Sequence, residues 1–176
     1  MNSFSNSLIL IGMPGSGKST LGIILAKMLA KDFVDTDLLI QIQQDKTLQD
    51  IVDNQGYLAL RDIEEQVLLN IHYPNHIIAT GGSAVYSEKA MQHLHHFGPI
   101  IFLDVALSDL LTRVNNIDTR GLARKPGQSF EALYDERRVL YQRYATITID
   151  CTGKNQEQIL EEIIFAEAEA YSGKDA

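Results

Sequence analysis

Short runs of apolar and β-branched residues recur along the whole chain. Within each run the residues are continuously apolar, which is typical of strands whose two faces are both buried. The pattern predicts five such strands, at residues 7–11, 33–34, 76–79, 99–103 and 146–149.

The longer stretches between these runs are interpreted as helices. Capping residues support their limits: Thr47 with Asp50 indicates a helix start and Gly56 a stop, while Ser87 and Gly98 bracket another helix. The predicted helices cover residues 19–31, 38–54, 58–71, 88–96, 108–116, 130–144 and 156–171.

Because strands and helices alternate from end to end, the sequence predicts an α/β fold. We expect a three-layer, doubly wound sandwich around a five-stranded parallel sheet. At 176 residues the chain has the size of one ordinary domain, and we therefore assign residues 1–176 to a single domain.

Residues 118–129 interrupt this alternation. They read DTRGLARKPGQS and combine two glycines and a proline with the cations Arg120, Arg124 and Lys125. One interpretation is a solvated connector between helices. The other is a lid that closes over a phosphate site.

Residues 12–19 read GMPGSGKS and match the phosphate-loop pattern G-x-x-x-x-G-K-[ST] without a mismatch. Glycines allow the backbone N–H groups of such a loop to surround a phosphate, and the following helix adds unpaired donors and a positive dipole end. Lys18 would place a cation at the β- and γ-phosphates, and Ser19 would be a ligand for Mg²⁺. The expected nucleotide site comprises Gly12, Gly15, Ser16, Gly17, Lys18, Ser19 and Thr20.

Two acidic residues, Asp35 and Asp37, follow the second predicted strand. In a doubly wound sheet the ligand crevice lies at the carboxyl ends of the strands. Side chains at i and i+2 of an extended chain point the same way, so both carboxylates are expected to face that crevice. One could bind Mg²⁺ and the other an acceptor hydroxyl, and a helix cap is an alternative role that can coexist with these.

Charge and cysteine content argue against several classes of protein. The chain has 15 Lys and Arg against 23 Asp and Glu, a net charge of −8, which argues against a general nucleic-acid binder. Cys151 is the only cysteine, so an internal disulfide is impossible. The sequence has no apolar stretch of membrane-spanning length and no basic leader, and we expect a cytoplasmic protein.

With these motifs in place, the chain resembles the shikimate kinases over nearly its whole length. The resemblance rests on the phosphate loop followed by Thr20-Leu-Gly, on the D-[ST]-D motif at residues 35–37, on residues 56–64 (GYLALRDIE), on residues 79–83 (ATGGS) and on E-R-x-x-L-Y at residues 136–141.

The resemblance implies a phosphate-loop kinase fold that uses ATP and Mg²⁺, with substrate-binding helices at about 38–71 and a lid at about 118–129. It implies Asp35 near Mg²⁺, Asp37 on the reacting hydroxyl, Arg61 and Arg137 on the substrate carboxylate, the backbone of Gly81 and Gly82 along the substrate, Arg113 near the adenine and Arg120 at the phosphates. Arg61 and Glu64 are three residues apart on a predicted helix, so the carboxylate could orient the guanidinium.

The sequence departs from the family pattern at three places. Ser83 replaces the third glycine of the substrate loop, Gly121 and Ala123 interrupt the usual R-P-L-L of the lid, and Val139 stands where proline is common. Ser83 adds a Cβ and a hydroxyl beside the expected acceptor.

The function expected from the resemblance is the ATP-dependent phosphorylation of shikimate to shikimate 3-phosphate, in aromatic amino acid (chorismate) biosynthesis, by a monomer. Alternatives are a kinase for a gluconate-like polyol acid or a nucleoside monophosphate, and a slow ATPase that acts as a nucleotide switch. Residues 100–104 (IIFLD) could supply a second metal ligand, but we interpret Asp104 as a strand end that caps the next segment.

Overall fold

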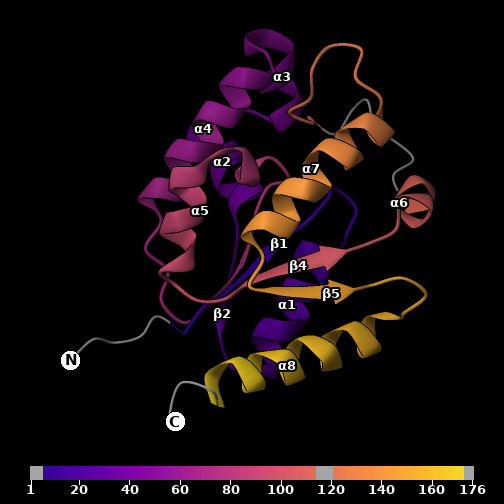
Figure 1. Ribbon diagram of the computed structural model, residues 1–176. Coiled ribbons are helices and arrows are strands. Elements are labelled where there is room, and N and C mark those ends of the chain that lie inside the picture. Colours follow the sequence, from indigo (N-terminus) through magenta and orange to yellow (C-terminus); the bar gives the residue numbers. More distant parts are fainter. Residues whose placement is uncertain (1–5, 114–120, 173–176) are drawn as a thin grey trace.

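All five expected strands are present in the computed structural model, which describes residues 6–113 and 121–172. They are β1 (Leu8–Ile11), β2 (Asp32–Asp35), β3 (His76–Ala79), β4 (Ile100–Asp104) and β5 (Ile147–Asp150). The strands form a parallel sheet in the order β2-β3-β1-β4-β5 (Figure 1). The predicted five-stranded parallel sheet is therefore confirmed.

The central strand, β1, is completely buried. All four of its side chains are 0% exposed, as expected for a strand covered on both faces, whereas the edge strand β2 is partly exposed along its length. This explains why β1 reads as an uninterrupted apolar run.

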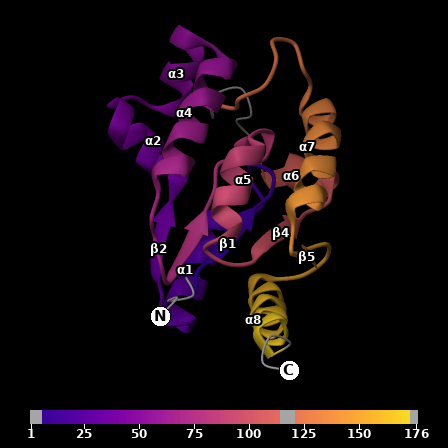
Figure 2. The same cartoon turned by 60° about the vertical axis from the view of Figure 1, so that its left-hand side comes forward.

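Helices cover both faces of the sheet. Crossover connections between parallel strands are right-handed, so connections that run in opposite directions along the sheet lie on opposite faces. On one face lie α1 (Lys18–Met28) and α8 (Gln156–Ser172), which contact each other. On the other lie α4 (Tyr57–Asn70), α5 (Glu88–His95) and α7 (Phe130–Tyr144) (Figure 2). The three-layer prediction is confirmed.

The single helix predicted over residues 38–54 is wrong. Two helices occupy this stretch, α2 (Thr36–Gln44) and α3 (Leu48–Gln55). Asp45 adopts a left-handed conformation with φ 49° that ends α2, and Thr47 is extended and forms a capping box with Asp50 at the start of α3. The cap expected at Thr47 is confirmed, and it is also the reason that one helix cannot continue through this point.

Two short helices and one irregular segment make up the rest of the described chain. A 3₁₀ helix, η1 (Ala84–Tyr86), follows the glycine pair after β3 and was not predicted. Helix α6 (Leu107–Arg113) was predicted to reach residue 116, and residues 114–116 lie outside the described ranges. Residues 121–129 connect to α7 without a regular element.

No helix in the described ranges has both the length and the apolarity needed to cross a membrane.

Candidate active site

The phosphate loop follows the carboxyl end of β1, at the centre of the sheet. Gly12, Gly15 and Gly17 have φ values of 148°, 85° and 94°, which L side chains rarely adopt. These angles let the loop curl around the space that its backbone N–H groups face. The chain then enters α1 at Lys18. The predicted phosphate cradle therefore has the backbone conformation that its sequence requires.

Lys18 lies at the base of this loop and is only 9% exposed. Its Nζ donates hydrogen bonds to the carbonyl oxygens of Gly12 (2.8 Å) and Met13 (3.0 Å). Burial lowers the pKa of Lys18 to about 8, and the nearby carboxylates of Asp37 and Asp35 oppose this shift. Ser16, 2% exposed, has a buried hydroxyl without a hydrogen-bond partner among the described residues.

Asp35 combines the two roles that the sequence left open. Its Oδ1 accepts hydrogen bonds from the backbone N–H groups of Asp37 (2.9 Å) and Leu38 (3.4 Å), which makes it the N-cap of α2. Its Oδ2 accepts a hydrogen bond of 2.5 Å from the Ser19 hydroxyl. The two predicted Mg²⁺ ligands are thus in direct contact.

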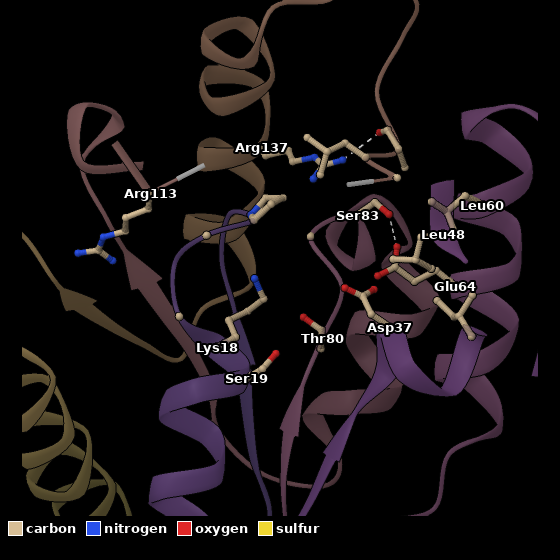
Figure 3. Close-up of a pocket in the computed structure, with 18 of the residues that line it drawn as sticks. Lys18, Ser19, Asp37, Leu48, Leu60, Glu64, Thr80, Ser83, Arg113 and Arg137 are labelled. Atoms are coloured by element: carbon tan, nitrogen blue, oxygen red, sulfur yellow. Dashed lines mark hydrogen bonds between the residues drawn. The ribbon is translucent and has the colours of Figure 1, made fainter. Parts of the chain in front are cut away.

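The extended chain predicted at Asp37 is wrong. Asp37 lies in the first turn of α2 and not on an extended chain, because the helix begins at Thr36. The carboxylate nevertheless faces the cavity beyond the phosphate loop (Figure 3). The helix turn, and not strand alternation, directs it there.

This cavity has a volume of about 390 Å³, and its lining includes residues of both the predicted nucleotide site and the predicted acceptor site. In Figure 3, Asp37, Glu64 and Ser83 lie on one side of it, Arg113 on the other, and Lys18 between them. Of the predicted site residues, Gly15, Gly17, Lys18, Ser19, Thr20, Asp37, Gly82, Arg113 and Arg137 line the cavity, whereas Gly12, Ser16, Asp35, Arg61 and Gly81 lie outside its lining. Arg120 lies outside the described residues.

Gly81 allows two carboxylates to converge next to the cavity. A Cβ at Gly81 would lie 2.5 Å from Asp37 Oδ1 and would also overlap Glu64 Oε1, and a Cβ at Gly82 would lie 2.7 Å from Arg137 Nη1. The glycine pair therefore leaves room for three charged groups at close range. Tyr141 donates a 2.6 Å hydrogen bond to the Gly82 carbonyl oxygen and fixes the turn.

Glu64 and Ser83 form a buried pair that the sequence did not predict. Glu64 is 2% exposed and accepts a hydrogen bond from the Ser83 hydroxyl. Burial raises the pKa of Glu64 to about 7, Asp37 adds to the shift, and the Ser83 hydrogen bond opposes it. The departure from glycine at position 83 was the signal that could have pointed to this contact.

We had expected the Glu64 carboxylate to orient Arg61, but Arg61 has other partners. Its Nη2 donates to the Ala123 carbonyl oxygen at 3.1 Å, and its guanidinium lies over the rings of Tyr86 and Tyr57. It lines a smaller cavity of about 160 Å³ that shares Glu64 and Ser83 with the larger one. Arg61 therefore borders the predicted acceptor site from outside the main cavity.

Arg137 and Arg138 have different environments on α7. Arg137 is 1% exposed, and its Nη2 donates to the same Ala123 carbonyl oxygen at 2.9 Å (Figure 3), so it is not a solvated helix charge. Arg138 donates two hydrogen bonds to the Asp104 carboxylate, at 3.1 and 2.7 Å. Asp104 is thus an ion-pair partner of α7, which corrects the cap that we had expected.

Comparisons with known proteins agree with this geometry. A family model for shikimate kinase matches residues 14–166. A shikimate kinase of Rippkaea orientalis is 39% identical over 163 residues, covering 91% of this chain and 87% of the relative. One of Sulfurihydrogenibium sp. is 34% identical over 159 residues, covering 90% and 95%. The solved shikimate kinase from Acinetobacter baumannii in complex with shikimate matches with a TM-score of 0.83 at 26% identity and 93% coverage of both chains.

Proposed function

The chain belongs to the shikimate kinase family, and we propose that it transfers the γ-phosphoryl group of ATP to a hydroxyl of shikimate. The product would be shikimate 3-phosphate, used in aromatic amino acid biosynthesis. One observation carries the proposal: a single cavity joins the phosphate loop and Lys18 to Asp37 and Arg137. Phosphoryl transfer needs a phosphate cradle, a proton acceptor and an anchor for the acceptor within one space.

On the nucleotide side, the loop N–H groups and Lys18 are proposed to bind the β- and γ-phosphates. The buried Ser16 hydroxyl, which has no partner among the described residues, is suited to the same phosphates. Arg113 at the far side of the cavity is proposed to border the adenine, and Arg120 to reach the transferring phosphoryl group.

Ser19 and Asp35 fit a Mg²⁺ ion. Mg²⁺ prefers oxygen ligands and keeps few protein ligands beside phosphate oxygens and water, and the two side chains are in contact next to the loop. When bound, the ion neutralises charge on the phosphates.

On the acceptor side, Asp37 is proposed to accept the hydroxyl proton. The acceptor oxygen forms its bond to the γ-phosphorus while the bond from that phosphorus to the bridging oxygen of ADP breaks. Arg137 and Arg61 are proposed to bind the shikimate carboxylate, since guanidinium groups bind carboxylates through charge-assisted hydrogen bonds. The backbone at Gly81 and Gly82 would lie along the acceptor ring.

We further propose that residues 1–176 act as one domain, that loop 121–129 belongs to a lid, and that the protein works as a monomer in the cytoplasm. The proposed site residues all come from one chain, and a net charge of −8 disfavours nucleic acid as a partner.

Steady-state ADP production measured with shikimate, gluconate, a nucleoside monophosphate or no acceptor tests the function. We expect turnover that depends on shikimate. Lys18→Met should lower kcat by at least about 100-fold, and Asp37→Asn by about 100-fold or more, with circular dichroism to confirm the folds. Equal ATP consumption with and without shikimate would indicate a nucleotide switch, and preference for another acceptor would replace shikimate.

A further inference from the structure

Tyr86, the last residue of η1, lies against both arginines that border the acceptor site. The Cζ of Arg61 lies 3.4 Å from the centroid of the Tyr86 ring, and the Cζ of Arg137 lies 5.5 Å from it. Both distances fall within the range of cation–π interactions. Tyr86 does not line the cavity that contains the phosphate loop; it lines the smaller cavity beside Arg61.

The hydroxyl of Tyr86 fixes the other end of the side chain. It donates a 2.5 Å hydrogen bond to Glu136 Oε1, on the helix that carries Arg137. The second oxygen of Glu136 accepts hydrogen bonds from Lys125 Nζ (3.2 Å) and Gln128 Nε2 (3.1 Å). The hydroxyl therefore links η1 to α7 and, through Glu136, to loop 121–129.

The two guanidinium groups need such a support because they converge. Both donate to the single carbonyl oxygen of Ala123, so two positive charges meet at one acceptor. Like charges at this range repel each other, and the negative face of an aromatic ring offsets part of that repulsion. Arg61 Nε is buried without a hydrogen-bond partner among the described residues, so ring stacking is a principal constraint on this side chain.

We propose that Tyr86 is a positioning residue for the acceptor carboxylate: its ring holds Arg61 and Arg137 at the spacing that one carboxylate can bridge. This inference rests on the proposed function. A bound acceptor carboxylate would accept the two hydrogen bonds that Arg61 and Arg137 donate to the Ala123 carbonyl oxygen in this structure. Tyr86 would hold both guanidinium groups in place before the carboxylate binds.

Tyr86→Leu removes the ring, and Tyr86→Phe removes only the hydroxyl. We expect Tyr86→Leu to raise the KM for shikimate about 10-fold, with less than about 3-fold change in kcat and in the KM for ATP, whereas Tyr86→Phe changes each constant less than about 3-fold. Tyr144→Leu is a matched control, because Tyr144 stacks on Arg143 at 5.3 Å outside the site, and it should leave all three constants near wild type.

A second readout separates positioning from general damage. The carboxamide of shikimate lacks the negative charge, and its weaker binding should differ little between wild type and Tyr86→Leu. If Tyr86→Leu does not fold, trifluorophenylalanine at position 86 replaces it, since fluorination keeps the ring shape and weakens the cation–π attraction; compared with Tyr86→Phe it should raise the KM for shikimate several-fold.

Calorimetric titration with shikimate distinguishes the possible failures. Wild-type protein that does not bind shikimate would overturn the proposed function and this inference with it. Wild-type protein that binds shikimate, together with unchanged affinity in Tyr86→Leu or in the trifluorophenylalanine protein, would overturn the inference alone. Equal losses of shikimate and ATP affinity would also overturn it, because they indicate a structural role.

Discussion

Two acidic side chains meet beside Gly81, one from α2 and one from α4. Asp37 faces the main cavity, whereas Glu64 is 2% exposed and hydrogen-bonded to Ser83. Two carboxylates at this range cannot both ionise without cost, and burial disfavours the charge of Glu64 further. Burial and the neighbouring Asp37 carboxylate therefore both favour the protonated form of Glu64.

The first residue-scale prediction concerns the stability of the fold against pH. The pKa of Glu64 is about 7 in the folded protein against 4.5 for a free group, so between these values the native state binds the proton more tightly than the unfolded state. Ionising Glu64 therefore costs stability as the pH rises from about 4.5 to 7. Asp37 strengthens the effect, and Arg137 and Lys18 weaken it.

Urea unfolding of wild type and Glu64→Gln between pH 4.5 and 8 measures this. The free energy of unfolding of wild type should fall relative to that of Glu64→Gln as the pH rises to about 7 and then level off. Curves that run parallel over the whole range would show that the pKa of Glu64 is not raised in the folded protein.

The second residue-scale prediction concerns Ser83, which replaces a glycine of the family pattern. Its hydroxyl donates to the Glu64 carboxylate and so favours the charged form. Ser83→Ala and Ser83→Gly should both raise the pKa of Glu64 further, because each removes a hydrogen bond to the charged carboxylate, which contributes about 1.5–3 kcal/mol. In an unfolding series extended to about pH 10, the free energy of unfolding of both variants should keep falling to a higher pH than that of wild type. A shift in Ser83→Gly alone would assign the effect to the Cβ instead of the hydroxyl.

At the scale of elements, the break between α2 and α3 depends on one local motif. Thr47 accepts a hydrogen bond from the Asp50 N–H at 3.1 Å, and Asp50 Oδ2 accepts one from the Thr47 N–H at 3.2 Å. This box lets α3 start in a new direction and pack against α4. Leu48 at its first position lines the main cavity, so the break also shapes the side of the cavity where we propose that the acceptor binds.

Thr47→Ala should destabilise the protein by about 1 kcal/mol, because it removes the side-chain oxygen that caps α3. Thr47→Ser keeps that oxygen and should lie within about 0.5 kcal/mol of wild type. Urea unfolding at one pH measures both. Equal stability of the alanine and serine variants would mean that tertiary packing alone holds the start of α3.

Local motifs were predictable from the sequence and long-range contacts were not. The phosphate loop, the Thr47 cap and the buried strand β1 follow from residues adjacent in the chain. The contact of Ala123 with Arg61 joins residues 62 positions apart, and the Tyr86 bond to Glu136 spans 50. Such pairs depend on how the sheet order brings η1, α4 and α7 together, which periodicity does not encode.

At the scale of the whole molecule, the cavity lies between two groups of helices. Helices α2, α3 and α4 flank one side and α7 the other, and loop 121–129 spans them (Figure 1). The Gly121 N–H donates to Gln49 Oε1 on α3 at 2.7 Å, and Lys125 and Gln128 bond to Glu136 on α7. The loop is thus anchored at both ends.

Gly121 explains one departure from the family sequence. Its φ of 64° is inaccessible to proline, whose ring fixes φ near −65°. A Cβ at this position would also lie 2.5 Å from the Gln49 backbone nitrogen. The close approach of the loop to α3 therefore requires glycine, and the hydrogen bond to Gln49 depends on it.

The last prediction tests whether this anchor controls opening of the loop. Trypsin can cut after Arg124 but not after Lys125, which precedes Pro126. Gln49→Ala removes the acceptor of the Gly121 hydrogen bond, worth about 1 kcal/mol, so the open population and the cleavage rate should rise about 5-fold. Gln92→Ala, on the exposed surface of α5, is the control and should leave the rate unchanged.

Ligands should act in the opposite direction. Gly121, Leu122 and Ala123 line the cavity, so ATP and shikimate bound together would contact the loop and favour its closed state. Cleavage after Arg124, followed by mass spectrometry, should slow with both ligands more than with either alone. A rate that responds neither to Gln49→Ala nor to the two ligands would mean that loop 121–129 is a connector and that closure of the site depends on other segments.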